Sequence, residues 1–339
     1  MSIIPVEVPT GAIRYNTDSN KMECFNGTKW YEIAVSSPDL NGGARAVFMG
    51  GAVYPATKKD EIDYITISSA GNAIDFGNLS SAVQSPTGFA SATRAFSSGG
   101  IVSSETDTIE YVTFSSLGNA TDFGNLTDTK EQGSGLSNAT RGIYAGGYNA
   151  PSNVGINIID YVTMSSAGNA VDFGDLTALR WGLGSFANPI RGIMAGGRAP
   201  GASQAIDFIA IPTKGNAQDF GDLSVLGGGM NNDGCSNATR GVWMGGYNAG
   251  PAKVANIETV MIASLGNSVK FGDMGSACAL GGAVASPVRG VAPLGDVGGS
   301  VVNTIEYISL QTAGDAVDFG DLTVARCIMA SCSNAHGGL

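Results

Sequence analysis

A repeat with a period near 50 residues is the feature that most constrains the fold of this chain. Residues 159–176 read IDYVTMSSAGNAVDFGDL, and residues 109–126 read IEYVTFSSLGNATDFGNL. Four further copies begin at Ile62, Ile206, Ile257 and Ile305. Repeats of this length are supersecondary units that bury their apolar faces against their neighbours, so we expect the copies to fold together.

The spacing of one phenylalanine measures the period. It recurs at intervals of 47, 50, 47, 51 and 48 residues, at Phe76, Phe123, Phe173, Phe220, Phe271 and Phe319. Apolar and polar residues alternate within each copy, and Gly, Asn and Ser cluster between these stretches, as in short strands joined by turns. Glycine at 50 of 339 positions and a charged content of 14% fit the same all-β interpretation. Strand-like repeats of this length are typical of the blades of a β-propeller.

The copy that ends at Leu176 shows how the strands are expected to run. Strands are predicted at Arg141–Ala145, Ile159–Met164 and Val171–Leu176. The Ser165–Asn169 segment is predicted to be a hairpin turn whose Gly-Asn pair adopts φ > 0.

The fourth strand of each unit is expected between one copy and the next strand that begins with arginine. Such segments begin near Ala82, Thr129, Arg180, Val225 and Ala277, and the last one runs from Arg326 to Ala335. The strand Arg45–Met49 has no preceding repeat to supply its neighbour. The C-terminal segment is therefore predicted to pair with it and to close a ring of six blades, which removes an exposed sheet edge.

These residues resemble the kelch family of propellers. The shared pattern is a Gly-Gly doublet, an aromatic strand, a turn, a second aromatic residue and an arginine, here at Gly146–Gly147, Tyr161, Ser165–Asn169, Phe173 and Arg180. The resemblance covers about residues 41–339 and implies a six-bladed kelch-like β-propeller closed by the C-terminal strand. In the sixth copy Leu294–Gly295 replaces the doublet, so a local irregularity is expected there.

Residues 1–40 lie outside the repeats and are predicted to form a separate assembly or attachment module. Residues 11–33 have the pattern of a three-stranded β-meander with turns at 17–20 and 26–28. The GAIRYNT start and the NGTKW end resemble a short module of bacteriophage tail-fibre and other virion proteins. So small a sheet cannot bury enough apolar surface alone. Its aromatic residues are therefore expected to pack on another chain or on the chain's own propeller: Tyr15, Phe25, Trp30 and Tyr31.

Charge and apolar content argue against two classes of partner. The chain carries 29 acidic and 18 basic residues, a net charge of −11, which disfavours a nucleic-acid surface. The N-terminus lacks a basic and apolar leader, and no stretch approaches the roughly 18 apolar residues of a membrane span. We therefore expect a soluble protein, made in the cytoplasm, that inserts into no membrane.

Residue spacing offers little for catalysis or metal binding. The five cysteines form no CxxC pair, so no disulfide or zinc site is expected, and Cys327 and Cys332 are interpreted as small buried side chains on one strand. The copper site of some kelch-type oxidases needs two histidines, whereas His336 is the only one here, and no G-x-S-x-G motif accompanies it. The prediction is a protein that is not an enzyme, with no catalytic residue, metal or cofactor.

Acidic residues recur in register in the copies. One series is Asp63, Glu110, Asp160, Asp207, Glu258 and Glu306. The other is Asp75, Asp122, Asp172, Asp219 and Asp318, and Lys270 interrupts it. Carboxylates in a ring could hold Ca²⁺. We favour a structural role, in which they accept turn N–H groups or pair with the recurrent arginines at Arg94, Arg141, Arg191, Arg240 and Arg289.

The loops after the Gly-Gly doublets differ most between copies and are the predicted ligand-binding surface. The residues chosen there are Tyr54, Tyr148, Asn149, Arg198, Tyr247 and Asn248. The kelch resemblance implies that they surround one end of the central channel. Aromatic rings beside Asn and Arg suit stacking on sugars or anchoring a protein, although the prolines of these loops could simply stiffen them.

The resemblances together imply a phage virion structural protein, a tail fibre or surface-displayed adhesin, located in the virion after synthesis in the host. Its expected partners are other virion proteins, further copies of itself in a homo-oligomer, and a host-surface glycan or protein. The alternative is a kelch scaffold outside a virion that binds a protein partner through the same loops.

Overall fold

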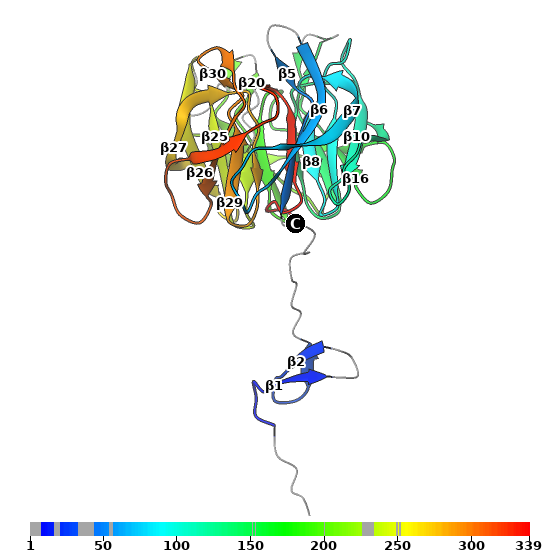
Figure 1. Cartoon of the computed structure of the whole chain (residues 1–339), viewed down its shortest axis with the longest axis vertical. Helices are drawn as coiled ribbons and strands as arrows, with labels where there is room; N and C mark the ends of the chain where they lie inside the picture. The colour runs from blue at the N-terminus through cyan, green and yellow to red at the C-terminus, as the bar shows by residue number, and fades with distance from the viewer. Residues whose placement is uncertain are drawn as a thin grey trace, which may run out of the picture. The chain divides into compact units, whose positions relative to one another are not determined.

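Every regular element of the computed structural model is a strand (Figure 1). The structure describes residues 8–16, 21–32, 44–53, 57–150, 152, 154–199, 201–225, 234–248, 250 and 252–339. Over these ranges there is no helix, and so none that could span a membrane. The predicted all-β class is confirmed. The chain divides into two compact units, Met1–Gly43 and Ala44–Leu339.

The first unit is a three-stranded antiparallel meander, as predicted. Its strands are β1 (Ile13–Asn16), β2 (Lys21–Phe25) and β3 (Trp30–Glu32). Asn26 holds the turn before β3, because its Oδ1 accepts the N–H groups of Thr28 at 3.0 Å and Lys29 at 2.9 Å. Gly27 completes this turn with a φ of 99°, which glycine adopts without strain. The turn predicted at 17–20 lies outside the described residues.

The second unit contains, over its described residues, six arrays of four antiparallel strands. Each array contains one strand that begins with arginine, and we number the arrays 1 to 6 in the chain order of these strands. Within an array, the four strands are called in sheet order the first strand, the arginine strand, the third strand and the fourth strand. From array 1 to array 6, the first strands are β34 (Ala330–Ser333), β8 (Thr87–Ala90), β12 (Ser134–Ser137), β18 (Gly184–Ala187), β24 (Gly234–Ser236) and β28 (Val284–Ala285). The arginine strands are β4 (Arg45–Met49), β9 (Arg94–Ser98), β13 (Arg141–Ala145), β19 (Arg191–Ala195), β25 (Arg240–Tyr247) and β29 (Arg289–Pro293).

The other two positions follow the same order. The third strands are β6 (Thr57–Thr66), β10 (Thr108–Thr113), β16 (Ile158–Thr163), β22 (Ala205–Ala210), β26 (Lys253–Met261) and β32 (Thr304–Ser309). The fourth strands are β7 (Ile74–Val83), β11 (Thr121–Asn125), β17 (Val171–Asp175), β23 (Gln218–Asp222), β27 (Val269–Ala279) and β33 (Val317–Asp321). The three strands predicted for one copy correspond to β13, β16 and β17.

The first strands begin later than predicted. β12 begins at Ser134 instead of near Thr129, and β18 begins at Gly184 instead of Arg180. The reason is a residue with positive φ that bends the chain just before each strand, as Gln132 does at 52°. The preceding residues therefore leave the extended conformation that their sequence pattern favours.

The C-terminal strand β34 pairs with β4, as predicted, so the end of the chain completes array 1. Ala330 lies opposite Met49 in this antiparallel pair. Cys332 lies in β34, but Cys327 does not, because Ile328 has a φ of 49° and interrupts the extended chain before the strand. Both cysteines are buried, as expected.

The arginine that begins each arginine strand reaches the next array. Arg45 Nη1 donates to the carbonyl of Phe114 at 2.7 Å, and Arg289 Nη1 donates to that of Ile67 at 3.0 Å, from array 6 back to array 1. Equivalent bonds are made by Arg94, Arg141, Arg191 and Arg240. The predicted pairing of these arginines with the recurrent acids is wrong, because each acid of the first series lies opposite the fourth residue of the arginine strand, out of line with the arginine.

The other role predicted for the first acidic series, accepting turn N–H groups, is confirmed. Asp160 accepts from the N–H of Thr127 at 3.2 Å, and Asp207 accepts from that of Thr177 at 3.0 Å. Asp63 and Glu258 accept equivalent bonds, whereas the donors to Glu110 and Glu306 are the N–H groups of Ser80 and Gly275, which lie in strands β7 and β27. The second series, in contrast, is exposed.

The Gly-Asn turn of each copy docks against the preceding array. A Cβ on Gly77 would lie 2.4 Å from the carbonyl oxygen of Gly118, so only glycine fits this approach. Asn119 Oδ1 accepts the N–H of Asn78 at 3.1 Å. The positive φ predicted for the Ser165–Asn169 turn is wrong, because neither Gly168 nor Asn169 is among the residues with positive φ, although the equivalent Gly118 has a φ of 151°. The asparagine side chain contributes the docking contact instead.

The apolar core lies between successive arrays. One cluster joins Met49 and Phe76 of array 1 to Phe114 of array 2. Another joins Phe48 of array 1 to Phe319 of array 6. Because the alternating strands bury one set of side chains on each face, every array contributes to two such clusters.

Short hairpin strands follow several arginine strands. They are β5 (Ala52–Val53), β14 (Tyr148–Asn149), β15 (Val154–Gly155), β20 (Arg198–Ala199), β21 (Gly201–Ala202), β30 (Asp296–Val297) and β31 (Ser300–Val301). β5, β20 and β30 lie at one end of the second unit, which we call the loop end, and the C-terminus lies at the opposite end (Figure 1). The irregularity expected in the sixth copy is present, because Leu294, at the place of the first doublet glycine, does not have the positive φ that Gly146 has at 63°.

Candidate functional site

Two predicted ligand residues, Tyr148 and Arg198, meet at the loop end around Trp181. The rings of Tyr148 and Trp181 are 5.4 Å apart at an angle of 58°. The main chains of Trp181 and Arg198 exchange hydrogen bonds of 3.2 and 2.9 Å. All three residues are half-buried, which leaves part of the aromatic pair available for contact. Sequence reasoning missed Trp181 because it was assigned to a strand. The available signal was its residue type, because no other copy has a tryptophan at this place.

Asn149 holds the loop instead of facing a ligand. It is buried, and its Nδ2 donates to the carbonyl of Thr129 at 3.1 Å. Its Oδ1 accepts from both the N–H and the hydroxyl of Ser152, at 3.1 and 2.7 Å. The amide is therefore committed to the hairpin that presents Tyr148.

Two further predicted ligand residues, Tyr247 and Asn248, lie at and just after the end of β25 in array 5. Tyr247 is half-buried against a cluster that includes Leu280 and Cys327, and this burial raises the pKa of its hydroxyl. Asn248 donates its main-chain N–H to Ala252 at 3.0 Å. Tyr54 lies outside the described residues.

Four buried side-chain oxygen atoms at or near the loop end have no hydrogen-bond partner within the described part of the chain. They are Glu105 Oε2, Glu131 Oε2, Gln132 Oε1 and Asn248 Oδ1. Burial raises the pKa of both glutamates. Glu131 adjoins Tyr148 through paired main-chain bonds of 3.1 and 2.8 Å. Buried acceptors without donors are costly, so this surface is arranged to receive hydrogen-bond donors from outside.

A set of strained residues precedes the first strands at this end. Ser85, Gln132, Leu280 and Ile328 have φ values of 56°, 52°, 63° and 49°. Their main chains are linked in sequence around the unit: Ile328 donates to Leu280 at 2.7 Å, Ser85 to Ile328 at 3.0 Å, and Gln132 to Ser85 at 3.4 Å. Non-glycine residues adopt such values only where the surrounding structure imposes them, and they concentrate at functional sites.

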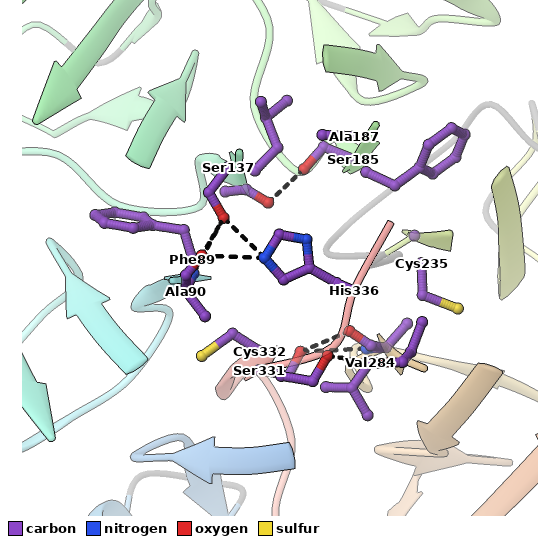
Figure 2. Close-up of a pocket in the computed structure, with 18 of the residues that line it drawn as sticks. Phe89, Ala90, Ser137, Ser185, Ala187, Cys235, Val284, Ser331, Cys332 and His336 are labelled. Atoms are coloured by element: carbon purple, nitrogen blue, oxygen red, sulfur yellow. Dashed lines mark hydrogen bonds between the residues drawn. The ribbon is translucent and has the colours of Figure 1, made fainter. Parts of the chain in front are cut away.

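A second site is a pocket of about 50 Å³ among the first strands of all six arrays. Figure 2 shows His336 pointing into it toward Ser137 and Ala90. His336 Nε2 lies 3.2 Å from Ser137 Oγ and 3.0 Å from the carbonyl oxygen of Ala90. The N–H of Gly338 donates to Nδ1 at 3.1 Å. Because Nδ1 is an acceptor, Nε2 carries the proton and donates to Ala90 and Ser137.

This geometry makes His336 a structural group. Burial lowers the pKa of its imidazole to about 4, so the ring is neutral near pH 7. A general base of the Ser-His-Asp type needs a free lone pair toward the serine, with its other nitrogen donating to a carboxylate. Here Nε2 is a donor, Nδ1 accepts from the main chain, and no acidic side chain lies among the described residues that line the pocket.

The predicted assembly residues of the first unit are divided between the two faces of its meander. The register pairs Tyr15 with Met22 on one face, and places Phe25 opposite Trp30 on the other. Tyr15 and Tyr31 are 53% and 48% exposed. Phe25 and Trp30 pack together at 5.3 Å beside Arg14.

The face that carries Tyr15 also carries Ile13, Met22, Cys24 and Tyr31, and we call it the apolar face of the meander. Ile13 and Met22 are 60% and 41% exposed. A sheet with one face this apolar and this exposed has the composition of an interaction surface.

Neither metal chemistry nor comparison adds a further site. In the ranges that the structure describes, no group of three or more His, Cys, Asp or Glu side chains could hold a metal ion. The chain matches no protein-family model, and no curated protein matches its sequence.

Proposed function

We propose that the second unit is a closed six-bladed β-propeller of the kelch type. Three observations support a ring: the arginine bonds run from each array to the next and from array 6 to array 1, β34 completes array 1, and the first strands of all arrays line one pocket. Closure of this kind leaves no long sheet edge exposed.

We further infer that the protein is a bacteriophage virion component, a tail fibre or surface-displayed adhesin, that recognises a glycan on the host surface through its loop end. The observation that carries this is a pair of buried oxygens without a donor, Glu131 Oε2 and Gln132 Oε1, next to the Tyr148–Trp181 pair. Sugars supply what such a surface lacks, since their hydroxyls donate hydrogen bonds and their ring faces stack on aromatic side chains.

The apolar face of the meander supports an assembly role for the first unit. Other virion proteins or further copies of the chain would cover Ile13, Tyr15 and Tyr31, which the small sheet leaves exposed. The resemblance of residues 11–33 to tail-fibre modules points in the same direction.

Adsorption of the purified chain to a panel of bacterial strains tests the recognition proposal. We expect binding that is lost when the cells are treated with periodate, which cleaves sugar diols, and retained after protease treatment. Trp181→Ala should bind more weakly. Loss after protease alone would show that the ligand is a host-surface protein, and the proposal of a glycan ligand would be wrong.

Light scattering on the full chain and on residues 41–339 tests the assembly proposal. A defined oligomer for the full chain and a monomer for the truncated one is the expected result. If both are stable monomers, the assembly role of residues 1–40 is wrong.

A further inference from the structure

The first acidic series divides the six arrays into two groups. In arrays 1, 3 and 4 the acid is an aspartate, and each is fully buried in an ion pair with a base that is also fully buried. The pairs are Asp63–Arg326 at 2.9 Å, Asp160–Lys130 at 2.6 Å and Asp207–Arg180 at 2.5 Å. Each base stands four residues after the leucine that ends the copy, as Lys130 follows Leu126.

In arrays 2, 5 and 6 the acid is a glutamate and no base stands at this position. Its place is taken by Val83 in array 2, by Gly227 in array 5, which lies outside the described residues, and by Cys278 in array 6. Aspartate therefore occurs where the chain supplies its own cation, and glutamate occurs where it does not.

The glutamates differ in how well the surrounding chain compensates their charge. Glu258 accepts main-chain N–H groups of Ser224 at 2.9 Å and Val225 at 2.8 Å, together with the hydroxyl of Ser268. Glu110 is 9% exposed, which makes it almost as buried as Glu258. Within the described chain it accepts a single hydrogen bond, of 3.3 Å, from the N–H of Ser80. A buried carboxylate with so little compensation is costly.

Glu110 lies on a pocket of about 110 Å³. Two small side chains open this space. One is Val83 at the position of the missing base, and the other is Ser97, which lies directly opposite Glu110. The residues opposite the acid in arrays 1, 3, 4 and 5 are the larger Phe48, Tyr144, Met194 and Trp243. Hydroxyl groups, among them those of Thr106 and Thr108, form much of the remaining wall.

We propose that this pocket binds a small organic cation, a protonated primary amine or a guanidinium group, as the counter-charge of Glu110. Such a ligand reproduces the lysine or arginine head group that fills the equivalent place in arrays 1, 3 and 4. The pocket is several times the roughly 30 Å³ that one water occupies, so it holds a head group of a few heavy atoms. The hydroxyl groups of the wall accept the remaining N–H donors.

Two features of the surroundings bear on this assignment. A divalent metal is disfavoured, because the described residues offer Glu110 no second and third acidic or imidazole ligand. One cation beside the pocket is already used by the chain, because the ammonium group of Lys58 donates to the carbonyl of Val102, a residue of the pocket wall. Lys58 therefore caps the wall and leaves the carboxylate of Glu110 to the ligand.

Saturation-transfer NMR and calorimetry on the full chain test the proposal, with methylammonium and methylguanidinium as probes and tetramethylammonium, which has no N–H donor, as the negative control. One saturable site per chain is expected, with a Kd on the order of millimolar for ligands this small. Glu110→Gln should weaken binding by roughly tenfold or more, because it removes a charge-assisted hydrogen bond.

Two further variants keep the result decisive. Val83→Lys places a base at the position that Lys130 has in array 3, so it should abolish probe binding while Glu110 is kept. Asp75→Asn removes an exposed charge in array 1 and should leave the Kd unchanged. The proposal is overturned if the wild-type chain shows no saturable binding, if Glu110→Gln binds equally well, or if binding appears only after Lys58→Met, which would make Lys58 the resident cation.

Discussion

Replacing Arg326 by methionine tests how strongly array 1 depends on the C-terminal segment. Arg326 Nη1 lies 2.9 Å from Asp63 Oδ2, and Nη2 donates to the carbonyl of Phe48 at 2.9 Å. In Arg326→Met, Asp63 keeps only the bonds from Thr323, 2.6 Å from its hydroxyl and 3.2 Å from its N–H. A buried charge that loses its partner costs about 3–5 kcal/mol. Because the Thr323 bonds remain, we expect a loss of about 3 kcal/mol in the free energy of unfolding.

Urea unfolding of the wild type and a double-mutant cycle with Asp63→Asn measure this loss. The double variant leaves no isolated buried charge, so its loss should be smaller than the sum of the two single losses by about 1 kcal/mol or more. Lys270→Met is the control, because the Lys270–Asp273 pair is 59% and 42% exposed and should contribute less than about 1 kcal/mol. Arg326→Met with wild-type stability, or strictly additive losses in the cycle, would refute the reasoning.

Three further predictions address the turns, the histidine and the loop end. Gly77→Ala should lose about 2 kcal/mol or more in urea unfolding, because its Cβ would lie 2.4 Å from a main-chain oxygen. Gly71→Ala has a similar φ and no atom within 4 Å, so an equal loss in both variants would contradict this cause. The pKa of His336 is about 4 in the folded chain, below its ordinary value of 6.5. As the pH falls, the unfolded chain therefore takes up this proton before the folded chain does. The free energy of unfolding should therefore fall between pH 6.5 and pH 4 by about 2–3 kcal/mol more than in His336→Gln. An unchanged difference between the two proteins at pH 7 and pH 4.5 would show that the ring is already solvated. Trp181→Ala should reduce adsorption to target cells roughly tenfold with little change in Tm, whereas Leu179→Ala, at an exposed position two residues earlier, should reduce neither.

Much of the fold could be predicted because its signals are local. The β13 strand follows the alternation of Arg141–Ala145, and the meander turn follows from Asn26 and Gly27. The start of β12 could not be predicted, since the positive φ of Gln132 is imposed by its contact with Ser85, which lies in another repeat.

The candidate site was only partly predictable for the same reason. Tyr148 and Arg198 could be chosen from loop composition alone. Trp181 and Glu131 were missed, because they join the site only through main-chain pairing with those loops. Asn149 was chosen as a ligand residue, yet its amide is used by Thr129 and Ser152.

Local patterns are enough to predict the repeat, the all-β class, most strands of each copy and the strand that completes array 1, since alternation and turn chemistry act over a few residues. Which charges meet depends on the packing of the arrays. Asp63 and Arg326 are far apart in the chain, and Glu110 has Val83 where Asp63 has a base, yet these acids occupy equivalent positions in equivalent strands. Their partners depend on which segment the neighbouring array brings within hydrogen-bonding distance, and that is a property of packing between sheets.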